Sequence, residues 1–226
     1  MAEQTLDMKT VKAAARARQI ARMRDSVQVL FASKTAVVGL VIVLAWVLVA
    51  IFAPLMTRYG PLEQDYLMLN EGPSAAHILG TDHLGRDVWS RLAYGARTIL
   101  TLGPLSVFVA FIVGIMLGLP AGYYGGWIDE TVMRVLDAIM AFPTILLYMI
   151  IISAVGASPF NVVVAIAIGG APGIARLVRA LTMDIRTREY VSAAKLRGDK
   201  DIEIMLREIL PNCRGPLIVD FLLRMG

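Results

Sequence analysis

The sequence predicts an all-α fold, a polytopic transmembrane helical bundle, from its composition, the length of its apolar runs and the hydrogen-bonding needs of the backbone. Of the 226 residues, 57% are apolar and only 18% are charged, whereas soluble chains have about 45 to 50% and about 25%. Several charge-free runs reach the roughly 20 helical residues that cross a hydrocarbon core of about 30 Å. Lipid offers no partners for backbone N–H and C=O groups, so these runs form helices, and the alternating segments of a membrane β-barrel are absent.

The first transmembrane helix is predicted over residues 35–56. Between Lys34 and Arg58 lie 23 residues without a charge. A cleavable signal peptide has a shorter apolar region of about 7 to 15 residues, followed by a small-x-small site, whereas this run leads into Pro54 and Leu55. We therefore expect this helix to be retained.

The region 98–226 is predicted to hold three further spans and the beginning of a fifth. Residues 98–128 carry no charge, and a glycine-rich GYYGG turn closes this second span. The apolar pattern resumes over residues 131–155 and again over 160–181, with a GASP turn between them. A last apolar run begins at Pro216 and stops before a fifth span is complete.

Lys and Arg residues set the predicted orientation. They are dense in the segment 1–34 and again after the fourth span. Four spans separate these two regions, so both lie on the same side of the membrane. The positive-inside rule assigns both to the cytoplasm, so the loop 57–97 is external and the segment 184–212 is cytoplasmic. Apolar residues at helical spacing from Ile20 to Phe31 predict an amphipathic helix on membrane lipid, so we expect no nucleic-acid partner.

The external loop contains the segment HILGTDHLGRDVWSRLAYGART, residues 77–98. Its glycines are typical of turns, and its acidic and basic side chains can pair with one another. The residues expected to order this loop are Gly80, Asp82, Gly85, Arg86, Asp87 and Arg91. GTDHLGRD has the glycine spacing of a phosphate-binding P-loop, but Arg86 replaces the Lys and Asp87 replaces the Ser or Thr. A carboxylate there repels phosphate, so nucleotide binding is rejected.

The histidines of this loop allow two interpretations. His77, Asp82, His83 and Asp87 carry the imidazole and carboxylate groups that suit divalent first-row metals. The alternative, which we favour, is a self-bonded cap over the helix ends, without a metal. The single cysteine, Cys213, makes a disulfide framework impossible, and a Cys/His zinc site is not expected.

Two patterns inside the predicted spans concern packing and charge. Small residues recur at every fourth position: Gly114, Gly118, Gly122 and Gly126. This spacing is typical of close helix packing, within the chain or against a partner. Arg134 and Asp137 form an i, i+3 pair near a helix end. Most of the free-energy cost of placing a charged side chain in the hydrocarbon core is avoided at such a position. An ion-coupled secondary transporter, with broken helices and ionisable residues near the midplane, is therefore disfavoured, and no arrangement of catalytic residues supports an enzyme.

Residues 189–212, EYVSAAKLRGDKDIEIMLREILPN, predict a helix, a turn and a second helix on the cytoplasmic face. Gly198 can take the left-handed conformation that ends a helix, and Asp199 and Asp201 are suited to starting the next. The second helix carries an apolar stripe of Ile202, Met205, Leu206 and Ile209. Pro211 is expected to stop it. The two helices either pack under the bundle or lie in a groove of another protein.

Residues 77–98, the segment GYYGGWIDETVMRVLDAIMAFP and residues 189–212 together resemble the inner-membrane permease subunit of bacterial ATP-binding-cassette importers. The resemblance covers residues 35–226 and is to the C-type permease of the dipeptide, oligopeptide and nickel group. It implies a bundle of the type I ABC importer permease kind, with a cytoplasmic coupling helix. The ATPase-coupling residues it implies are Glu189, Tyr190, Val191, Ser192, Ala193, Ala194, Lys195 and Gly198. Ser192 stands where the family pattern has Glu.

The resemblance also implies partners and location. Such a permease works with a second homologous permease subunit, two ATP-binding-cassette ATPase subunits and a periplasmic or extracellular solute-binding protein. It lies in the bacterial inner membrane with a cytoplasmic N-terminus and a periplasmic loop 57–97. This chain contains no Walker motif, so we expect it not to be an enzyme and to hold no cofactor. ATP and Mg belong to the partner ATPase subunits.

The implied function is conformational. ATPase closure pushes the coupling helices and rocks the bundle between outward-facing and inward-facing states. Peptide is the expected cargo, and nickel or another non-peptide solute is the alternative. Permeases of this kind usually have six spans, so the sequence is expected to lack part of the pathway wall.

Overall fold

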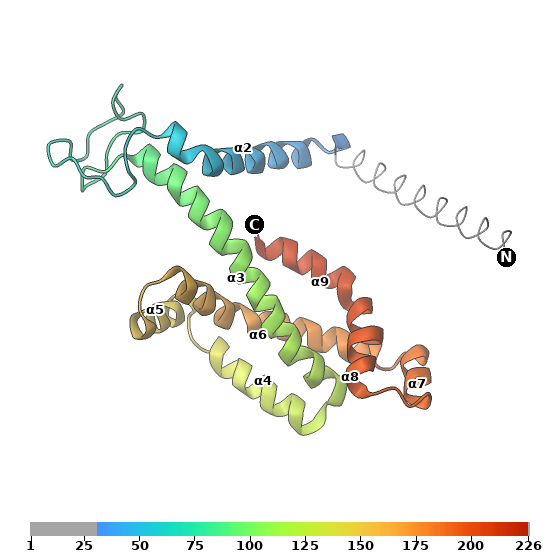
Figure 1. The fold of residues 1–226 in the computed structure, drawn as a ribbon. Helices are drawn as coiled ribbons and strands as arrows, with labels where there is room; N and C mark the ends of the chain where they lie inside the picture. Colours follow the sequence, from blue (N-terminus) through green and yellow to red (C-terminus); the bar gives the residue numbers. More distant parts are fainter. Residues whose placement is uncertain (1–30, 226) are drawn as a thin grey trace, which may run out of the picture. The chain divides into compact units, whose positions relative to one another are not determined.

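The computed structural model describes residues 31–225, and the regular secondary structure in this range is helical apart from one isolated bridge between Thr81 and Asp87 (Figure 1). The predicted all-α class is confirmed. The elements in chain order are α2 (Lys34–Met56), α3 (Val88–Tyr124), α4 (Gly126–Met140), α5 (Thr144–Val155), α6 (Pro159–Ile185), α7 (Glu189–Leu196), α8 (Asp201–Glu203), the π-helix η1 (Ile204–Ile209) and α9 (Leu210–Met225). Most of the basic segment 1–34, with its predicted amphipathic helix, lies outside the described residues.

The chain divides into two compact units, residues 1–97 and 98–226, which are described separately. In the first unit, α2 corresponds to the predicted first span. Ser33 caps this helix, since its Oγ accepts a hydrogen bond from the N–H of Ala36 at 3.4 Å. Only 11% of the most apolar stretch of α2 is buried within the protein, as expected for a helix with lipid around it.

Three of the described helices are long and apolar enough to cross a membrane: α2 with 23 residues, α3 with 37 and α6 with 27. At about 1.5 Å per residue, α3 is much longer than a hydrocarbon core of about 30 Å. Part of α3 therefore extends beyond the membrane.

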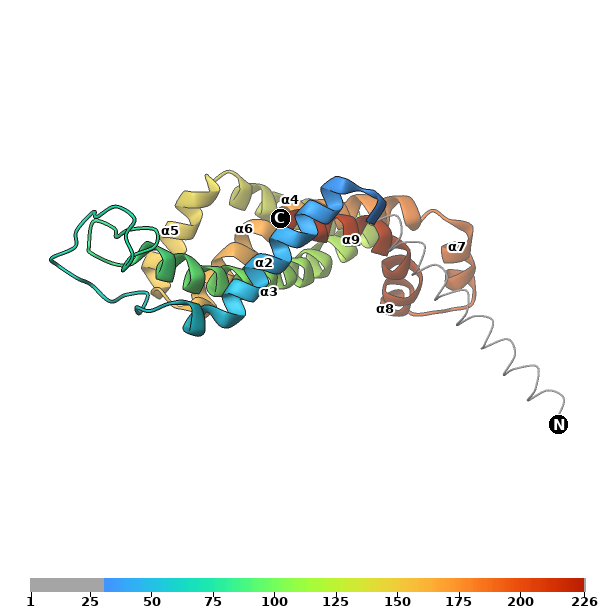
Figure 2. The same cartoon turned by 90° about the horizontal axis from the view of Figure 1, so that it is seen from above.

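The predicted third span, residues 131–155, is not one straight helix. It consists of α4 and α5, whose axes differ by 90° across a short break (Figures 1 and 2). Pro143 lies at this break. Proline cannot donate a backbone hydrogen bond and restricts the residue before it, here Phe142. The helix therefore ends and restarts at this point, so the predicted third span consists of two helices with a break between them.

The core of the second unit includes the contact between α3 and α6. A Cβ added at Gly114, Gly118 or Gly122 would lie 2.6, 2.3 or 2.7 Å from the nearest atom of α6. The shortest of these distances is to the carbonyl oxygen of Ala175. The predicted close helix packing thus occurs within the chain at these three glycines. Gly126 differs, because it has no atom within 4 Å of an added Cβ and begins α4 with a φ of +53°.

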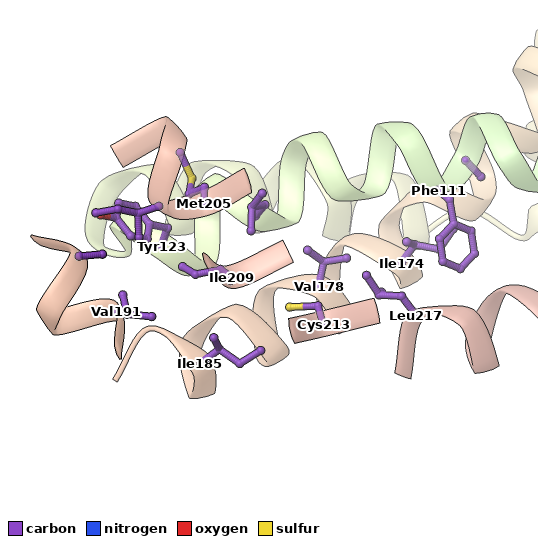
Figure 3. Packing of buried hydrophobic residues seen from close by; sticks show 14 of the residues in the cluster. Phe111, Tyr123, Ile174, Val178, Ile185, Val191, Met205, Ile209, Cys213 and Leu217 are labelled. Carbon is purple, nitrogen blue, oxygen red and sulfur yellow. The ribbon is translucent and has the colours of Figure 1, made fainter. Parts of the chain in front are cut away.

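Buried side chains from later helices complete this core (Figure 3). They include Phe111 and Tyr123 of α3, Ile174, Val178 and Ile185 of α6, Val191 of α7, Met205 and Ile209 of η1, and Cys213 and Leu217 of α9. The segment from α7 to α9 is therefore packed into the same apolar core as α3 and α6.

Candidate functional site

The segment from α7 to η1 contains the predicted coupling residues, and α7 ends in a well-formed turn. Gly198 has a φ of +82°. Its N–H donates to the carbonyl of Lys195 at 3.0 Å, and the N–H of Asp199 donates to the carbonyl of Ala194 at 3.2 Å. These two bonds form the Schellman pattern, which favours glycine in the left-handed region. The conformation predicted for Gly198 is confirmed.

One narrow face of α7 is buried and the rest of the helix is exposed. Val191 and Ala194 are both 0% exposed and belong to the core cluster. The other helical members of the predicted coupling set are exposed: Glu189, Tyr190, Ser192, Ala193 and Lys195. The structure therefore divides this set into two anchoring residues and an open face.

Leu196 lies on the open side of α7 and is absent from the predicted set. Its exposed fraction is 90%. Leu196 follows Ala193 by three residues and Glu189 by seven, which is the spacing of one helix face. This spacing was the available signal in the sequence.

The second helix of the segment does not end at Pro211, contrary to the prediction. Helices α8, η1 and α9 follow one another directly, and Pro211 is the second residue of α9. At the end of η1 the N–H of Leu210 donates to the carbonyl of Met205, five residues earlier. A proline in a regular α-helix clashes with the carbonyl four residues before it, and the wider π turn relieves such a clash. The side-chain amide of Asn212 donates to the carbonyl of Glu208 at 2.6 Å.

The π turn also changes which residues are buried. Of the predicted apolar stripe, Met205 and Ile209 are buried, but Ile202 is 55% exposed and Leu206 is 50% exposed. Ile204 is buried instead, at 1% exposure. Ile204 and Ile209 are five residues apart, which suits a π-helix and not the 3.6-residue period used for the prediction.

Tyr123, near the end of α3, contacts both α7 and α8. Its hydroxyl donates a hydrogen bond to Oδ1 of Asp201 at 2.7 Å. The Nζ of Lys195 lies 5.0 Å from the centre of its ring, within the range of a cation–π contact. The backbone carbonyl of Tyr123 accepts from Arg186 at 3.0 Å. These contacts have no direct signal in the sequence, since GYYGG predicts only a turn.

Two ion pairs join α4 to α6. Arg179 binds both carboxylate oxygens of Asp129, with Nη2 2.5 Å from Oδ2. Arg176 pairs with Asp137. The side chains of Asp129 and Arg179 are 15% and 32% exposed, and those of Asp137 and Arg176 are 58% and 46% exposed. The first pair is thus the better shielded from solvent.

The predicted i, i+3 pairing between Arg134 and Asp137 does not form. Arg134 pairs with Glu130, four residues earlier on α4, while Asp137 pairs with Arg176 across the helices. Long-range packing offers Asp137 a partner that the local sequence does not reveal.

In the first unit, Asp82 organises the loop between α2 and α3. Its Oδ1 accepts from the N–H groups of Leu84 and Arg86 at 2.8 and 3.1 Å. Its Oδ2 accepts from Nε of Arg86 at 2.9 Å and also binds Arg91. Burial raises the pKa of Asp82, but these bonds from Arg86 and Leu84 outweigh burial and hold the pKa below its ordinary value.

Asp87 pairs with a histidine and not with an arginine. Its Oδ1 lies 3.0 Å from Nδ1 of His77, and its Oδ2 accepts from the N–H of Ser90 at 2.7 Å. The second bond makes Asp87 the N-cap of α3. Tyr59 stacks on His77 with ring centres 4.6 Å apart. Burial raises the pKa of Asp87, but hydrogen bonds from Ser90 and His77 lower it below its ordinary value.

Gly80 and Gly85 adopt conformations that require glycine. Their φ angles are +76° and +73°. A Cβ would lie 2.3 Å from the carbonyl oxygen of Glu71 at the first and 2.0 Å from that of Asp65 at the second. Both turns therefore depend on the absence of a side chain.

The two histidines considered for a metal site are in different environments. His77 is 6% exposed and bonded to Asp87, whereas His83 is exposed. Within residues 31–225, no three His, Cys, Asp or Glu side chains are arranged to hold a metal ion. The oxygens of Asp82 and Asp87 are engaged by N–H donors of the loop itself.

Two protein families match the sequence. The family described as binding-protein-dependent transport system inner membrane component matches residues 114–226, which is half of the chain. The family described as the N-terminal transmembrane domain of oligopeptide transport permease C matches residues 22–73. The first match includes every element from α4 to α9.

Several curated proteins are similar to this chain. The dipeptide transport system permease protein DppC of Alkalihalophilus pseudofirmus is 43% identical over 203 residues, which cover 90% of this chain and 67% of that protein. The glutathione transport system permease protein GsiD of Pectobacterium atrosepticum is 46% identical over 162 residues, or 72% of this chain and 54% of that protein. A putative peptide transport system permease protein of Brucella suis is 41% identical over 182 residues, or 80% and 61%. The chain thus spans about half to two thirds of the length of these relatives.

Proposed function

Because this chain belongs to the family of binding-protein-dependent transport system inner membrane components, we propose that it is the membrane-spanning permease subunit of an ATP-driven importer for peptides or a related small solute. The relatives reported above are transport permeases and not enzymes. The helices α2, α3 and α6, and the broken pair α4 and α5, supply the multi-pass membrane part that such a subunit needs.

Family membership decides between this class and an ion-coupled secondary transporter. Broken spans and ionisable residues are features of secondary transporters, and the second unit contains both a broken span and ion pairs between α4 and α6. These features therefore do not separate a secondary transporter from an importer permease. The match over residues 114–226 favours the importer.

The proposed coupling element is α7, and the observation that carries the proposal is its open face. The buried Val191 and Ala194 fix the helix on the core, while Leu196 projects an apolar side chain that is 90% exposed. An exposed apolar side chain on a helix that is held at both ends suits insertion into a groove of another protein. In the proposed assembly that groove belongs to an ATP-binding-cassette ATPase subunit. Ser192, in place of the usual Glu, lies exposed on α7 and offers a hydroxyl where a charge would stand.

The proposed assembly contains two such ATPase subunits, a second homologous permease subunit and a solute-binding protein. ATP and Mg are bound by the ATPase subunits. The proposed orientation places α7 and the N-terminal segment in the cytoplasm, because Lys and Arg are concentrated in the N-terminal segment and around α7. The loop between α2 and α3 then lies outside the inner membrane.

Cysteine labelling tests this orientation. Native Cys213 is 0% exposed, so its failure to react carries no information about sidedness. Leu67 and Leu196 are each 90% exposed and make suitable probes. An impermeant thiol reagent added to intact cells should label Leu67→Cys and not Leu196→Cys. The opposite pattern would place α7 outside and remove it from contact with an ATPase.

Co-purification tests the coupling role. In the full-length protein, Leu196→Asp should lower the amount of ATPase recovered with the permease by about fivefold, the effect of losing about 1 kcal/mol at an interface. Leu67→Asp is the matched control, because it makes the same change at an equally exposed leucine in the loop. Equal recovery of ATPase with both variants would contradict the assignment of α7.

Peptide is the proposed cargo, and glutathione is the second candidate. The relative from Alkalihalophilus pseudofirmus is named for dipeptide transport and that from Pectobacterium atrosepticum for glutathione transport. In a strain without the gene, uptake of a labelled dipeptide and of labelled glutathione should separate the two. Restoration of dipeptide uptake by the wild-type gene supports the first cargo, and restoration of glutathione uptake alone supports the second.

A further inference from the structure

Three helices meet at the last turn of α3. The guanidinium of Arg186, directly after α6, donates to the carbonyl oxygens of Gly122 and Tyr123 at 2.9 and 3.0 Å. The side chain of Tyr123 reaches Asp201 at the start of α8, and Lys195 of α7 lies over its ring. Tyr123 thus connects the end of α3 to both short helices of the candidate coupling segment.

The contacts of Tyr123 differ in kind from the other contacts of this segment. Val191 and Ala194 lie in the apolar core, where the attraction between side chains has no preferred direction. The hydroxyl of Tyr123 makes a hydrogen bond to a carboxylate, which fixes both distance and direction. Tyr123 itself is 7% exposed, whereas Asp201 at the other end of this bond is exposed.

The end of α3 is held from both sides. Arg186 satisfies carbonyls that the final turn of a helix leaves without partners, and its positive charge suits the negative end of the helix dipole. Tyr123 then extends from this fixed turn to Asp201. A displacement of α8, and of α7 through Lys195, therefore acts on the end of α3 and not only on the loop after it.

We propose that Tyr123 is the positioning residue that transmits movement of the α7–α8 turn to α3. The proposal rests on the proposed function, since the movement originates in ATPase closure against α7. Its specific content is that the bond between Tyr123 and Asp201 makes α7 and α3 move as one body.

A distance measurement in the assembled transporter tests this directly. Spin labels are placed at Lys200→Cys in the turn between α7 and α8 and at Met116→Cys in α3, which are both exposed, in a Cys213→Ala background. The distance between the labels should stay the same when the complex is trapped with ATP and vanadate. In the Tyr123→Phe variant the distance should change or its distribution should broaden on trapping. A change already present in the wild type, or an unchanged distance in the variant, would overturn the proposal.

Transport measurements supply the second readout. Solute imported per ATP hydrolysed should fall about tenfold in Tyr123→Phe, the lower end of what losing a hydrogen bond to a charged group produces. Asp201→Ala removes the same bond from the other helix, and with it the interaction of Asp201 with the neighbouring Tyr124, so its effect should be at least as large. The double variant should be no worse than Asp201→Ala alone. Glu203→Ala and Tyr66→Phe are controls, because they alter a neighbouring carboxylate of α8 and a hydroxyl of the loop.

The outcomes separate this inference from the proposed function. Failure of the ATPase to co-purify with the wild-type permease would refute the proposed function and the inference together. Normal co-purification with normal coupling in both Tyr123→Phe and Asp201→Ala would refute the inference alone. Additive losses in the double variant would show that the two residues act independently and would also refute it.

Discussion

Arg179 of α6 binds both carboxylate oxygens of Asp129 of α4, with Nη2 2.5 Å from Oδ2. The two residues are 50 positions apart in the sequence. A two-point contact between a guanidinium and a carboxylate fixes the relative rotation of the two groups as well as their distance. The pair therefore holds the beginning of α4 against α6 while each charge neutralises the other.

The first prediction concerns this ion pair. Arg179→Ala leaves Asp129 with an unpaired charge at 15% side-chain exposure, and should cost about 1 to 3 kcal/mol. This loss of stability is smaller than that expected for a fully buried ion pair, because the side chain of Arg179 is 32% exposed. Arg179→Lys should be intermediate, since it keeps the charge and loses the two-point geometry. Thermal unfolding of the purified protein in detergent measures the effect.

The matched control for this pair is Arg134→Ala. Arg134 pairs with Glu130, and the side chain of Arg134 is 77% exposed. Loss of this pair should therefore change the stability of the protein by less than about 0.5 kcal/mol. Exchanging the charges in Asp129→Arg with Arg179→Asp should recover part of the stability. Equal unfolding temperatures for Arg179→Ala and Arg134→Ala would show that the interhelical pair contributes no more than an exposed one.

The second prediction concerns the glycine contact between α3 and α6. Gly118→Ala would put a Cβ 2.3 Å from the carbonyl oxygen of Ala175, so the helices must separate, at a cost of about 1 to 3 kcal/mol. Gly95→Ala lies on the same helix with no atom within 4 Å of its Cβ. It should be neutral or slightly stabilising because alanine favours helix. Thermal unfolding should separate the two variants, and the same unfolding temperature for both would contradict the close packing.

The third prediction concerns the turn at Gly198. Gly198→Val places a side chain in open space, since no atom lies within 4 Å of its Cβ. The cost therefore comes from the backbone, at about 1 to 2 kcal/mol for a left-handed residue. Membrane insertion should be normal, while recovery of the ATPase with the permease should fall several-fold. Gly39→Val is the control, as Gly39 has neither a positive φ nor a close atom. Normal ATPase recovery and coupling in Gly198→Val would mean that the turn is only structural.

The fourth prediction is a loss of loop stability at acid pH. Asp82 and Asp87 have native pKa values below the ordinary value of about 3.9. Their contribution is therefore fully present above the unfolded pKa and is lost as the pH falls from about 4 toward the lower native pKa values. The protection factors of the loop amides, which correct for the intrinsic pH dependence of hydrogen exchange, should fall below about pH 4. Asp82→Asn should exchange faster at neutral pH and show a smaller further change on acidification.

The fifth prediction separates the two histidines of the loop. His77→Gln removes a buried ring that is bonded to Asp87 and stacked on Tyr59, so permease accumulation should fall by several-fold. His83→Gln changes an exposed side chain and should leave accumulation unchanged. Asp87→Ala should resemble His77→Gln, because both lose the same bond, and it also removes the N-cap of α3. A loss of transport in His83→Gln at normal protein level would favour the metal interpretation.

Much of the candidate site could be predicted where the relevant residues are close in the chain. The left-handed turn at Gly198 follows from a glycine after a short helical pattern, and its Schellman bonds join residues only three and five positions apart. The bonds between Asp82 and Arg86 are similarly local. At η1 the predicted 3.6-residue period of the apolar residues is wrong. A π turn and a regular α-helix cannot be distinguished by apolar spacing over six residues.

Hydropathy and local backbone preferences are enough to predict that this chain is helical and crosses a membrane, because both depend on neighbouring residues. Which distant groups meet depends on how the helices pack. Tyr123 and Asp201 are 78 residues apart, and the helices must cross at a particular place before their side chains can bond. The same holds for the partner of Asp137, which is Arg176 and not the nearby Arg134. Such pairings depend on the angle and closeness of packing between α3, α4 and α6, which no single segment specifies.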